Sequence, residues 1–398
     1  MPSVITHQLR DEFGVGAGAM SLMTSCFLYG YAAMQIPAGL LTDRFGPRKM
    51  LTCCVLLCCV AALAFCSTHH IFFASIARLV IGGASACAFI APLTLASRWF
   101  QDKHFAMIAG LVQVMGCVGA AAGQQPIAIL ANQVGWRYCM QMAALTGLVL
   151  SVLMWLVIRD HPSKTDPAKQ DANPEQSMDK EIGRLRSILN RKQTWAIALV
   201  GFGCWAPIGS FAELWGVSFI KELQSVSDAV AAKEVIWIWI GIALGSPLAG
   251  WWSNYIQSRR IPLYTFGCIA FVSTVFITYA SIHSVPLMCF FLFMLGVSAS
   301  AQPISFALVT DITPKDRTAT AVGFNNMAMV SAAFLLQPLI GMLLDFSWQG
   351  AYIDGVHSYG LYEFKIAFSL IPISILLGLL STHYWVKETH CKSQPSYG

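Results

Sequence analysis

Long apolar runs separated by short polar turns make up most of the chain. Eleven of these runs approach or exceed the roughly 20 residues that a helix needs to cross the hydrocarbon core of a bilayer. They lie at residues 20–41, 50–67, 71–98, 105–132, 138–158, 194–220, 230–253, 262–283, 286–310, 319–344 and 366–386. Because lipid offers no partner to an unpaired backbone group, we predict an all-α integral membrane protein with eleven spans.

One long polar stretch divides these runs into two blocks. Residues 159–192 are rich in Pro, Lys, Asp and Gln, which is typical of a solvated linker, and we expect a short surface helix from Met178 to Leu189 within them. The sequence therefore predicts a helical half over 1–158, a cytoplasmic linker over 159–193 and a second helical half over 194–398.

The two blocks repeat one another. The segment "AGLLTDRFGPRK" aligns with "AGWWSNYIQSRR", so that Gly39 and Gly250 are 211 residues apart, as are Asp43 and Asn254. Parallel helical repeats of this kind are a transporter architecture. The same offset predicts a helix before residue 10, of which only the last turns are present. Either the chain begins late or the repeat has lost this helix, and we expect a late start, because an odd number of spans places the two termini on opposite sides of the membrane.

Composition and charge agree with a membrane protein. The chain is 56% hydrophobic and only 11% charged, whereas soluble domains carry about 25% charged residues. With the turn at 42–49 on the cytoplasmic side, nineteen of the 25 Lys and Arg residues lie on that side and five on the other. This asymmetry predicts a bacterial inner-membrane protein with a cytoplasmic C-terminus, and it accounts for the net charge of +5 without a nucleic-acid partner.

The sequence carries no sign of metal or nucleotide chemistry. Most of the thirteen cysteines lie in apolar runs, where a free thiol packs as a small hydrophobe. No paired CxxC motif and no phosphate-binding loop occurs, so we expect no metal, no cofactor and no ATP-driven activity. The expected partners are the lipid bilayer, a small-molecule substrate and protons, and we expect the protein to be a monomer.

Three short segments carry a family resemblance. The segment "GLLTDRFGPRKM", residues 39–50, resembles the turn between the second and third helices of major facilitator superfamily transporters. The segment "RLVIGG", residues 78–83, resembles the family's fourth helix, and "DITPKDRTATAVGF", residues 311–324, resembles the turn between its tenth and eleventh helices. The resemblance implies twelve helices in two six-helix halves around a central site that opens alternately to each side. This chain departs from the pattern in its largely absent first helix and in Asn254, where the family has Asp.

The charged turn at 42–49 is the candidate gate. The resemblance implies that Asp43 pairs with Arg side chains and a nearby helix terminus while the cytoplasmic side is closed. Gly39 permits close helix packing, and Gly46 lets the turn fold back. Anchoring by positive charge explains the basic residues but neither Asp43 nor the glycines. The predicted gating residues are Gly39, Asp43, Arg44, Gly46, Arg48 and Lys49.

Two charged residues, Arg78 and Glu213, lie about two turns inside predicted spans. An intramembrane Arg costs at least ~2.5–3.5 kcal/mol on insertion scales, so Arg78 should face a polar cavity or a partner. The alternatives are hydrogen bonds to carbonyl groups or snorkelling to the outer interface. Glu213 lies at a similar depth and is a candidate proton carrier or partner for Arg78. An interfacial position beside Trp215 in the aromatic belt explains Glu213 equally well.

Four amide side chains are also candidates for the transport path. Gln113 and Gln124 are eleven residues apart, which places them nearly on one helix face, and Asn326 and Gln337 have the same spacing. These amides suit a cavity lining that hydrogen-bonds a polar substrate, although hydrogen bonds between helices explain them as well. The glycines at 116–123 predict close contact of the same helix with a neighbour.

We therefore expect a secondary active transporter that moves a small polar organic solute, anionic or zwitterionic, with coupling to protons. One alternative is efflux of drugs or of a metal-chelating small molecule. An alternative from another class is a non-transporting membrane sensor or scaffold, but neither the polar tract nor the tail "KETHCKSQPSYG" supplies a soluble signalling domain. No hydrolytic constellation occurs, so we do not expect an enzyme.

Overall fold

The computed structural model describes residues 13, 17–161, 178–350, 352–353, 356–357 and 359–392. In the first block the helices are α2 (Ala17–Phe45), α3 (Pro47–Ser67), α4 (Ile71–Ser85), α5 (Cys87–Trp99), α6 (Asp102–Val134) and α7 (Trp136–Val157). Each predicted span of this block coincides to within one residue with part or all of one helix or, for α4 and α5, of two consecutive helices. The prediction of helical spans is confirmed here.

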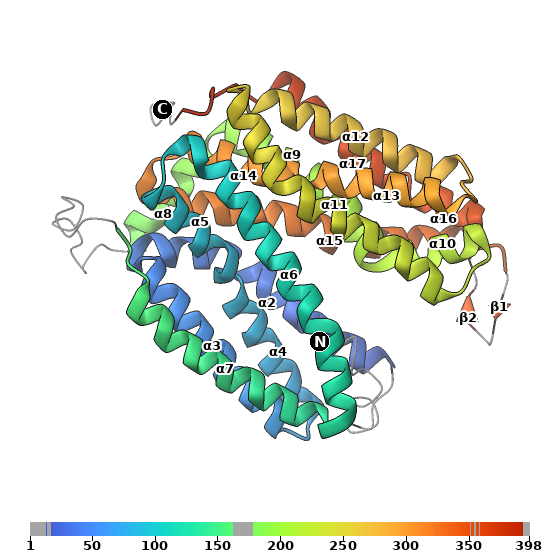
Figure 1. The fold of residues 1–398 in the computed structure, drawn as a ribbon, viewed down its shortest axis with the longest axis horizontal. Helices are drawn as coiled ribbons and strands as arrows, with labels where there is room; N and C mark the ends of the chain where they lie inside the picture. The colour runs from blue at the N-terminus through green and yellow to red at the C-terminus, as the bar shows by residue number, and fades with distance from the viewer. Residues whose placement is uncertain are drawn as a thin grey trace. The chain divides into compact units, whose positions relative to one another are not determined.

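The second block continues the pattern (Figure 1). Its helices are α8 (Met178–Leu189), α9 (Lys192–Pro207), the π-helix η3 (Ile208–Trp215), α10 (Gly216–Gln224), α11 (Asp228–Tyr255), α12 (Arg260–Tyr279), α13 (Val285–Ala299), α14 (Ala301–Asp311), the 3-10 turn η4 (Lys315–Arg317), α15 (Thr318–Ser347), α16 (Leu361–Ala367) and α17 (Leu370–Tyr384). The surface helix expected from Met178 to Leu189 is α8. One short hairpin, β1 (Tyr352–Ile353) and β2 (Val356–His357), pairs antiparallel. Within the described residues, nine helical segments are long and apolar enough to cross a membrane.

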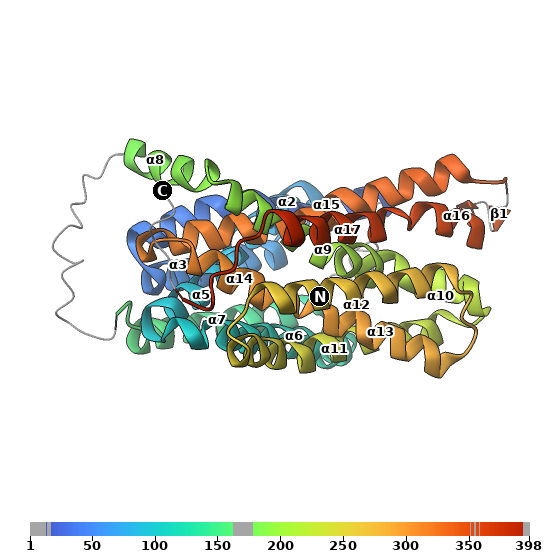
Figure 2. The ribbon, with the colours of Figure 1, turned by 90° about the horizontal axis from the view of Figure 1, so that it is seen from above.

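Contacts divide the chain into two units that do not follow the two sequence blocks throughout. The first unit includes the beginning of α15, and the second includes the beginning of α6. The first unit comprises residues 1–100, 115–186 and 314–324, and the second comprises 101–114, 187–313 and 325–398. In the first unit α2 packs on α4 and α3 packs on α7. In the second unit α11 packs on α13, and α17 packs on α9 and α12 (Figure 2).

Glycines hold the principal helix pair of the first unit at backbone contact. A Cβ added to Gly30 of α2 would lie 2.1 Å from the Leu79 carbonyl oxygen of α4, and one on Gly82 would lie 2.0 Å from the Phe27 carbonyl oxygen. Only glycine permits so close an approach, because any Cβ would overlap the facing backbone.

The second unit repeats this arrangement. A Cβ on Gly241 of α11 would lie 2.3 Å from the Phe293 carbonyl oxygen of α13, and one on Gly296 would lie 2.0 Å from the Ile238 carbonyl oxygen. Gly241 follows its counterpart in α2 by the offset of 211 expected from the sequence, whereas Gly296 follows its counterpart by 214. The helices of the two blocks are therefore related by the repeat, with three residues inserted between the paired helices of the second block.

Candidate functional site

Asp43 binds the beginning of helix α15. At the end of α2, its carboxylate accepts hydrogen bonds from the backbone N–H of Ala319 (2.9 Å), the backbone N–H of Thr320 (2.8 Å) and the Thr320 hydroxyl (2.6 Å). The first N–H groups of a helix have no partner within the helix and lie at the positive end of its dipole. A carboxylate there forms short, charge-assisted hydrogen bonds. Arg98 of α5 adds a favourable electrostatic interaction with Asp43.

Two glycines of the charged turn, Gly39 and Gly46, permit the close approach and the chain reversal that this site requires. A Cβ on Gly39 would lie 2.6 Å from the Ala319 carbonyl oxygen, so the end of α2 approaches α15 at backbone contact. Gly46 has φ of +85°, a conformation that favours glycine, and Pro47 begins α3 directly after it. A Cβ on Gly46 would also lie within 3.0 Å of the Asp160 carboxylate.

The basic residues of the turn do not bind Asp43 in this structure. Arg48 donates its backbone N–H to the Asp160 carboxylate (2.8 Å) and its guanidinium to the Trp155 carbonyl oxygen, and it lies 4.3 Å from the centre of the Trp155 ring. Arg44 lies over the Phe45 ring, and Lys49 is exposed. The helix terminus expected to bind Asp43 is that of α15, and the Arg that interacts electrostatically with Asp43 is Arg98 of α5, not a residue of the turn itself.

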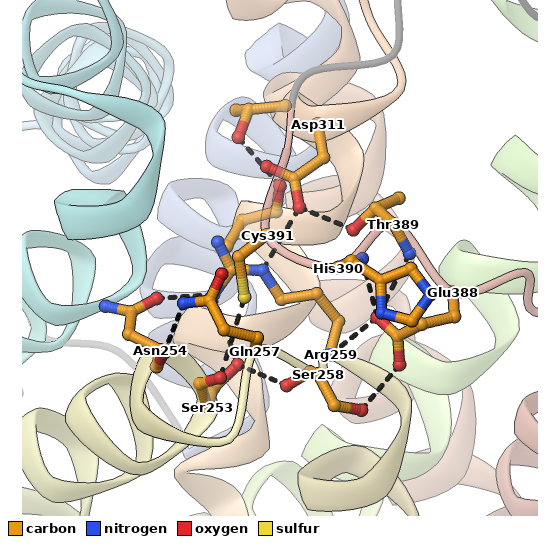
Figure 3. A network of polar contacts seen from close by, with 12 residues as sticks. Ser253, Asn254, Gln257, Ser258, Arg259, Asp311, Glu388, Thr389, His390 and Cys391 are labelled. Carbon is orange, nitrogen blue, oxygen red and sulfur yellow. Dashed lines mark hydrogen bonds and ion pairs between the residues drawn. The ribbon is translucent and has the colours of Figure 1, made fainter.

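The corresponding turn of the second unit lacks an acid and has a different network (Figure 3). Arg259, between α11 and α12, is fully buried, and its Nε lies 3.1 Å from the Asp311 carboxylate at the end of α14. Its Nη1 donates to the Ser253 hydroxyl (3.1 Å) and to the Asn254 side-chain oxygen (2.9 Å). Asn254 can accept this hydrogen bond without a charge, and Asp311 supplies the charge that balances Arg259.

The C-terminal segment completes this network. Glu388 accepts hydrogen bonds from the backbone N–H groups of Arg259 (2.8 Å) and Arg260 (3.0 Å) and from the Ser258 hydroxyl. The Thr389 hydroxyl donates to the Asp311 carboxylate (2.7 Å). In Figure 3, Asp311 binds the guanidinium of Arg259, whereas Glu388 binds its backbone N–H. The segment after the last span is thus tied to the turn between α11 and α12, a contact that our sequence analysis did not predict.

The electrostatics of Glu388 follow from this position. Burial alone would raise the pKa of its carboxyl group, but the hydrogen bonds from Arg259, Ser258 and Arg260 outweigh burial and hold this pKa below its ordinary value. The sequence did contain a hint of this contact, because Glu388 is an acidic residue shortly after the last apolar run and Arg259 and Arg260 form an adjacent basic pair. No sequence rule, however, pairs residues that lie about 130 positions apart.

Arg78 lies in the middle of α4, on the side that faces α2. Its guanidinium carbon is 5.0 Å from the centre of the Phe27 ring, a cation–π distance. Its Nε is buried and has no hydrogen-bond partner within the described part of the chain. A buried N–H without an acceptor is costly, so this donor is suited to an acceptor other than the described residues of the chain.

Glu213 lies on the π-helix η3, and its side chain is exposed. The wide turn begins directly after Pro207, which has no N–H to continue the α-helical ladder. Gln337 of α15 contacts this π-helix, because its side-chain amide donates to the Gly209 carbonyl oxygen (2.6 Å). Trp215 donates its indole N–H to the Gln337 carbonyl oxygen (3.4 Å).

The remaining amides are distributed over two helices. Gln113 is half-buried in α6 and Asn326 is buried in α15, while the side chain of Gln124 lies outside the described residues. A Cβ on Gly116 or Gly119 would meet no described atom within 4 Å, so the predicted close contact of this part of α6 has no partner among the described residues. The close contacts of the first unit are made instead by the glycines of α2 and α4, whose neighbours the spacing alone does not identify.

The sequence matches a known protein family. Residues 1–238 and 224–356 match the family model of the Major Facilitator Superfamily. A probable sulfoacetate transporter of Cupriavidus necator is 22% identical, over 86% of this chain and 82% of that protein. The hexuronate transporter of Bacillus subtilis is also 22% identical, over 86% of this chain and 83% of that protein.

A solved structure shows the same fold. The fucose:proton symporter of E. coli superposes with a TM-score of 0.69 at 14% identity, covering 97% of this chain and 95% of that chain. The family match extends over most of the chain, and the apolar helices and repeated glycine contacts agree with it. The chain therefore belongs to the major facilitator superfamily and is a multi-pass membrane transporter, not an enzyme.

Proposed function

We propose that the protein carries a small organic anion across the cytoplasmic membrane of a bacterium by alternating access, coupled to protons. The observation that carries this proposal is Arg78, a half-buried cation about two turns inside its span, whose buried Nε donor has no acceptor within the described residues. A carboxylate or sulfonate supplies the acceptor oxygens and the negative charge that an intramembrane guanidinium requires.

The relatives support the same class of substrate. Sulfoacetate and a hexuronate are both small organic acids that are ionised at neutral pH. The Lys and Arg asymmetry and the bacterial relatives support an inner-membrane location with the linker and C-terminus in the cytoplasm. A gate formed by Asp43 and the α15 terminus fits alternating access, since the three hydrogen bonds must break whenever these helix ends part.

We assign the proton to Glu213. Its place on a π-helix supports this role, because π-helical turns occur frequently at functional sites. Gln113, Gln124 and Asn326 are proposed to line the substrate path. The hydrogen bond from Gln337 to the Gly209 carbonyl oxygen favours a role for Gln337 in holding the π-helix that carries Glu213.

The test is flux in proteoliposomes. A thermal-shift screen of purified protein against organic acids selects the probe substrate, and its uptake is then measured with an imposed pH gradient. Arg78→Gln should raise KM for the anion about 10- to 100-fold, because charge-assisted hydrogen bonds contribute about 1.5–3 kcal/mol each. Arg78→Lys should retain part of the affinity, since Lys keeps the charge but loses the planar fork.

A matched control separates this effect from a general loss of charge. Arg186→Gln removes an exposed guanidinium from α8 and should leave uptake unchanged. Glu213→Gln should abolish acceleration by the pH gradient while exchange of substrate across the membrane persists. If Arg78→Gln transports the anion as wild type does, the anion proposal fails; if Glu213→Gln keeps uptake and its pH dependence, proton coupling through Glu213 fails.

A further inference from the structure

A cavity of 980 Å³ lies at the end of the second unit that adjoins the polar tract. Its walls are the first three turns of α9, the end of α17 and the beginning of the C-terminal segment. None of the residues assigned above to substrate, proton or gate lies in its lining. The cavity is therefore a candidate site for a different ligand.

The mouth of the cavity is cationic. Lys192 and Lys387 are exposed there, and the half-buried Arg191 is held in place by donating to the Ile312 carbonyl oxygen (2.7 Å). Glu388 also lines the cavity, and its oxygens already accept three hydrogen bonds from Ser258 and Arg259 of the turn before α12 and from Arg260, the first residue of α12. Among the described residues, the lining thus has three cations and one carboxylate, and that carboxylate already accepts hydrogen bonds from its neighbours.

The interior of the cavity is apolar and runs along the membrane-spanning part of α9. From Lys192 to Phe202 the helix rises about 15 Å, which is half of a hydrocarbon core roughly 30 Å thick. Trp195 and Leu199 line the wall between these two positions. Trp385 stands beside them at the end of α17, and it is 61% exposed, a position typical of aromatic residues at the membrane interface.

We propose that this cavity binds an anionic phospholipid from the leaflet next to the polar tract. The phosphate binds Lys192 and Lys387, and one acyl chain lies along Trp195 and Leu199. A basic site above an apolar groove between membrane helices is the arrangement that recognises such headgroups. This inference requires only that the chain spans a membrane, so it does not depend on the proposed substrate.

The same lipid should stabilise the C-terminal segment. The Gln193 side chain forms two hydrogen bonds with the backbone of Lys387, donating to its carbonyl oxygen (3.3 Å) and accepting from its N–H (3.2 Å). These bonds join the first turn of α9 to the tail at the cavity mouth. A phosphate bound by Lys192 and Lys387 would bridge the same two segments.

The experiment uses the full chain purified in a mild detergent. Native mass spectrometry measures lipid retained by wild type and by Lys192→Ser/Lys387→Ser after incubation with phosphatidylglycerol or with phosphatidylcholine of the same acyl chains. Each lysine near a headgroup contributes roughly fivefold in affinity, so the double variant should bind phosphatidylglycerol on the order of 25-fold more weakly. Lys221→Ser/Lys233→Ser, which removes two exposed lysines at the opposite ends of the second-unit helices, is the control and should bind as wild type does.

Thermal unfolding in the same samples gives a second readout. Phosphatidylglycerol should raise the Tm of wild type and not that of Lys192→Ser/Lys387→Ser, and equal Tm values without lipid show that both proteins are folded. The proposal is overturned if both lipids bind wild type equally, or if inorganic phosphate stabilises it as strongly as phosphatidylglycerol. Equal retention of phosphatidylglycerol by wild type and the double variant also overturns it.

Discussion

The buried ion pair of Arg259 and Asp311 should make a large contribution to the stability of the second unit. Removing the Arg259 guanidinium is the most direct test of the polar network shown in Figure 3. Both side chains are almost completely inaccessible, with exposed fractions of 0% and 1%. Arg259→Met keeps the length of the side chain but removes the guanidinium, so the Asp311 carboxylate stays buried without its cation. Removing one member of a buried ion pair costs about 3–5 kcal/mol.

The chain supplies its own control for this perturbation. Arg317 also forms an ion pair with a neighbouring carboxylate, Asp316, at 3.5 Å, but the exposed fractions of these side chains are 30% and 54%. Exposed pairs contribute about 0–1 kcal/mol, so Arg317→Met should change the free energy of unfolding little. The two Arg→Met variants differ in the burial of the pair and also in the two hydrogen bonds that Arg259 donates to Ser253 and Asn254, so their difference reports the buried network as a whole.

The assay is reversible unfolding in mixed detergent and SDS, followed by tryptophan fluorescence. Arg259→Met should unfold at a clearly lower SDS fraction than wild type, and Arg259→Met/Asp311→Leu should recover much of the loss, because no uncompensated charge then stays buried. An Arg259→Met protein within about 1 kcal/mol of wild type, or a double variant as unstable as the single one, would refute this reasoning.

Three further predictions concern the gate, the tail and the helix contacts. Asp43→Asn should lower the initial uptake rate roughly tenfold at equal membrane insertion, because an amide cannot make the charge-assisted hydrogen bonds to the α15 terminus; unimpaired uptake in proteoliposomes contradicts it. The folded-state pKa of Glu388 lies below its ordinary 4.5, so its contribution is present above pH 4.5 and is lost as pH falls through the folded value. The Tm measured against pH should therefore fall less below pH 4.5 for Glu388→Gln than for wild type. An equal fall of Tm in both proteins would contradict a stabilising role of Glu388 in this network. Gly82→Ala should lower the Tm, because its Cβ would overlap the Phe27 carbonyl oxygen. Gly116→Ala, whose Cβ meets no described atom within 4 Å, should not; equal Tm values for the two variants would rule out the backbone contact of α2 and α4.

Local chemistry accounts for what could be predicted from the sequence alone. Each span had to satisfy its own backbone and match the thickness of the bilayer, so its position follows from its own residues. The surface helix expected from Met178 to Leu189 was found with these bounds. Gly46 and Pro47 likewise specify a turn through their own backbone restrictions, whatever surrounds them.

Partners distant in the chain depended on tertiary structure. Asp43 binds Thr320, 277 residues away, and Glu388 binds Arg259, 129 residues away, because helix packing brings these ends together. No spacing rule joins such positions, since the energy of a hydrogen bond depends on distance in space and not along the chain. Hydrophobicity alone thus determined which segments enter the membrane, and only the packed helices decided which charges face each other there.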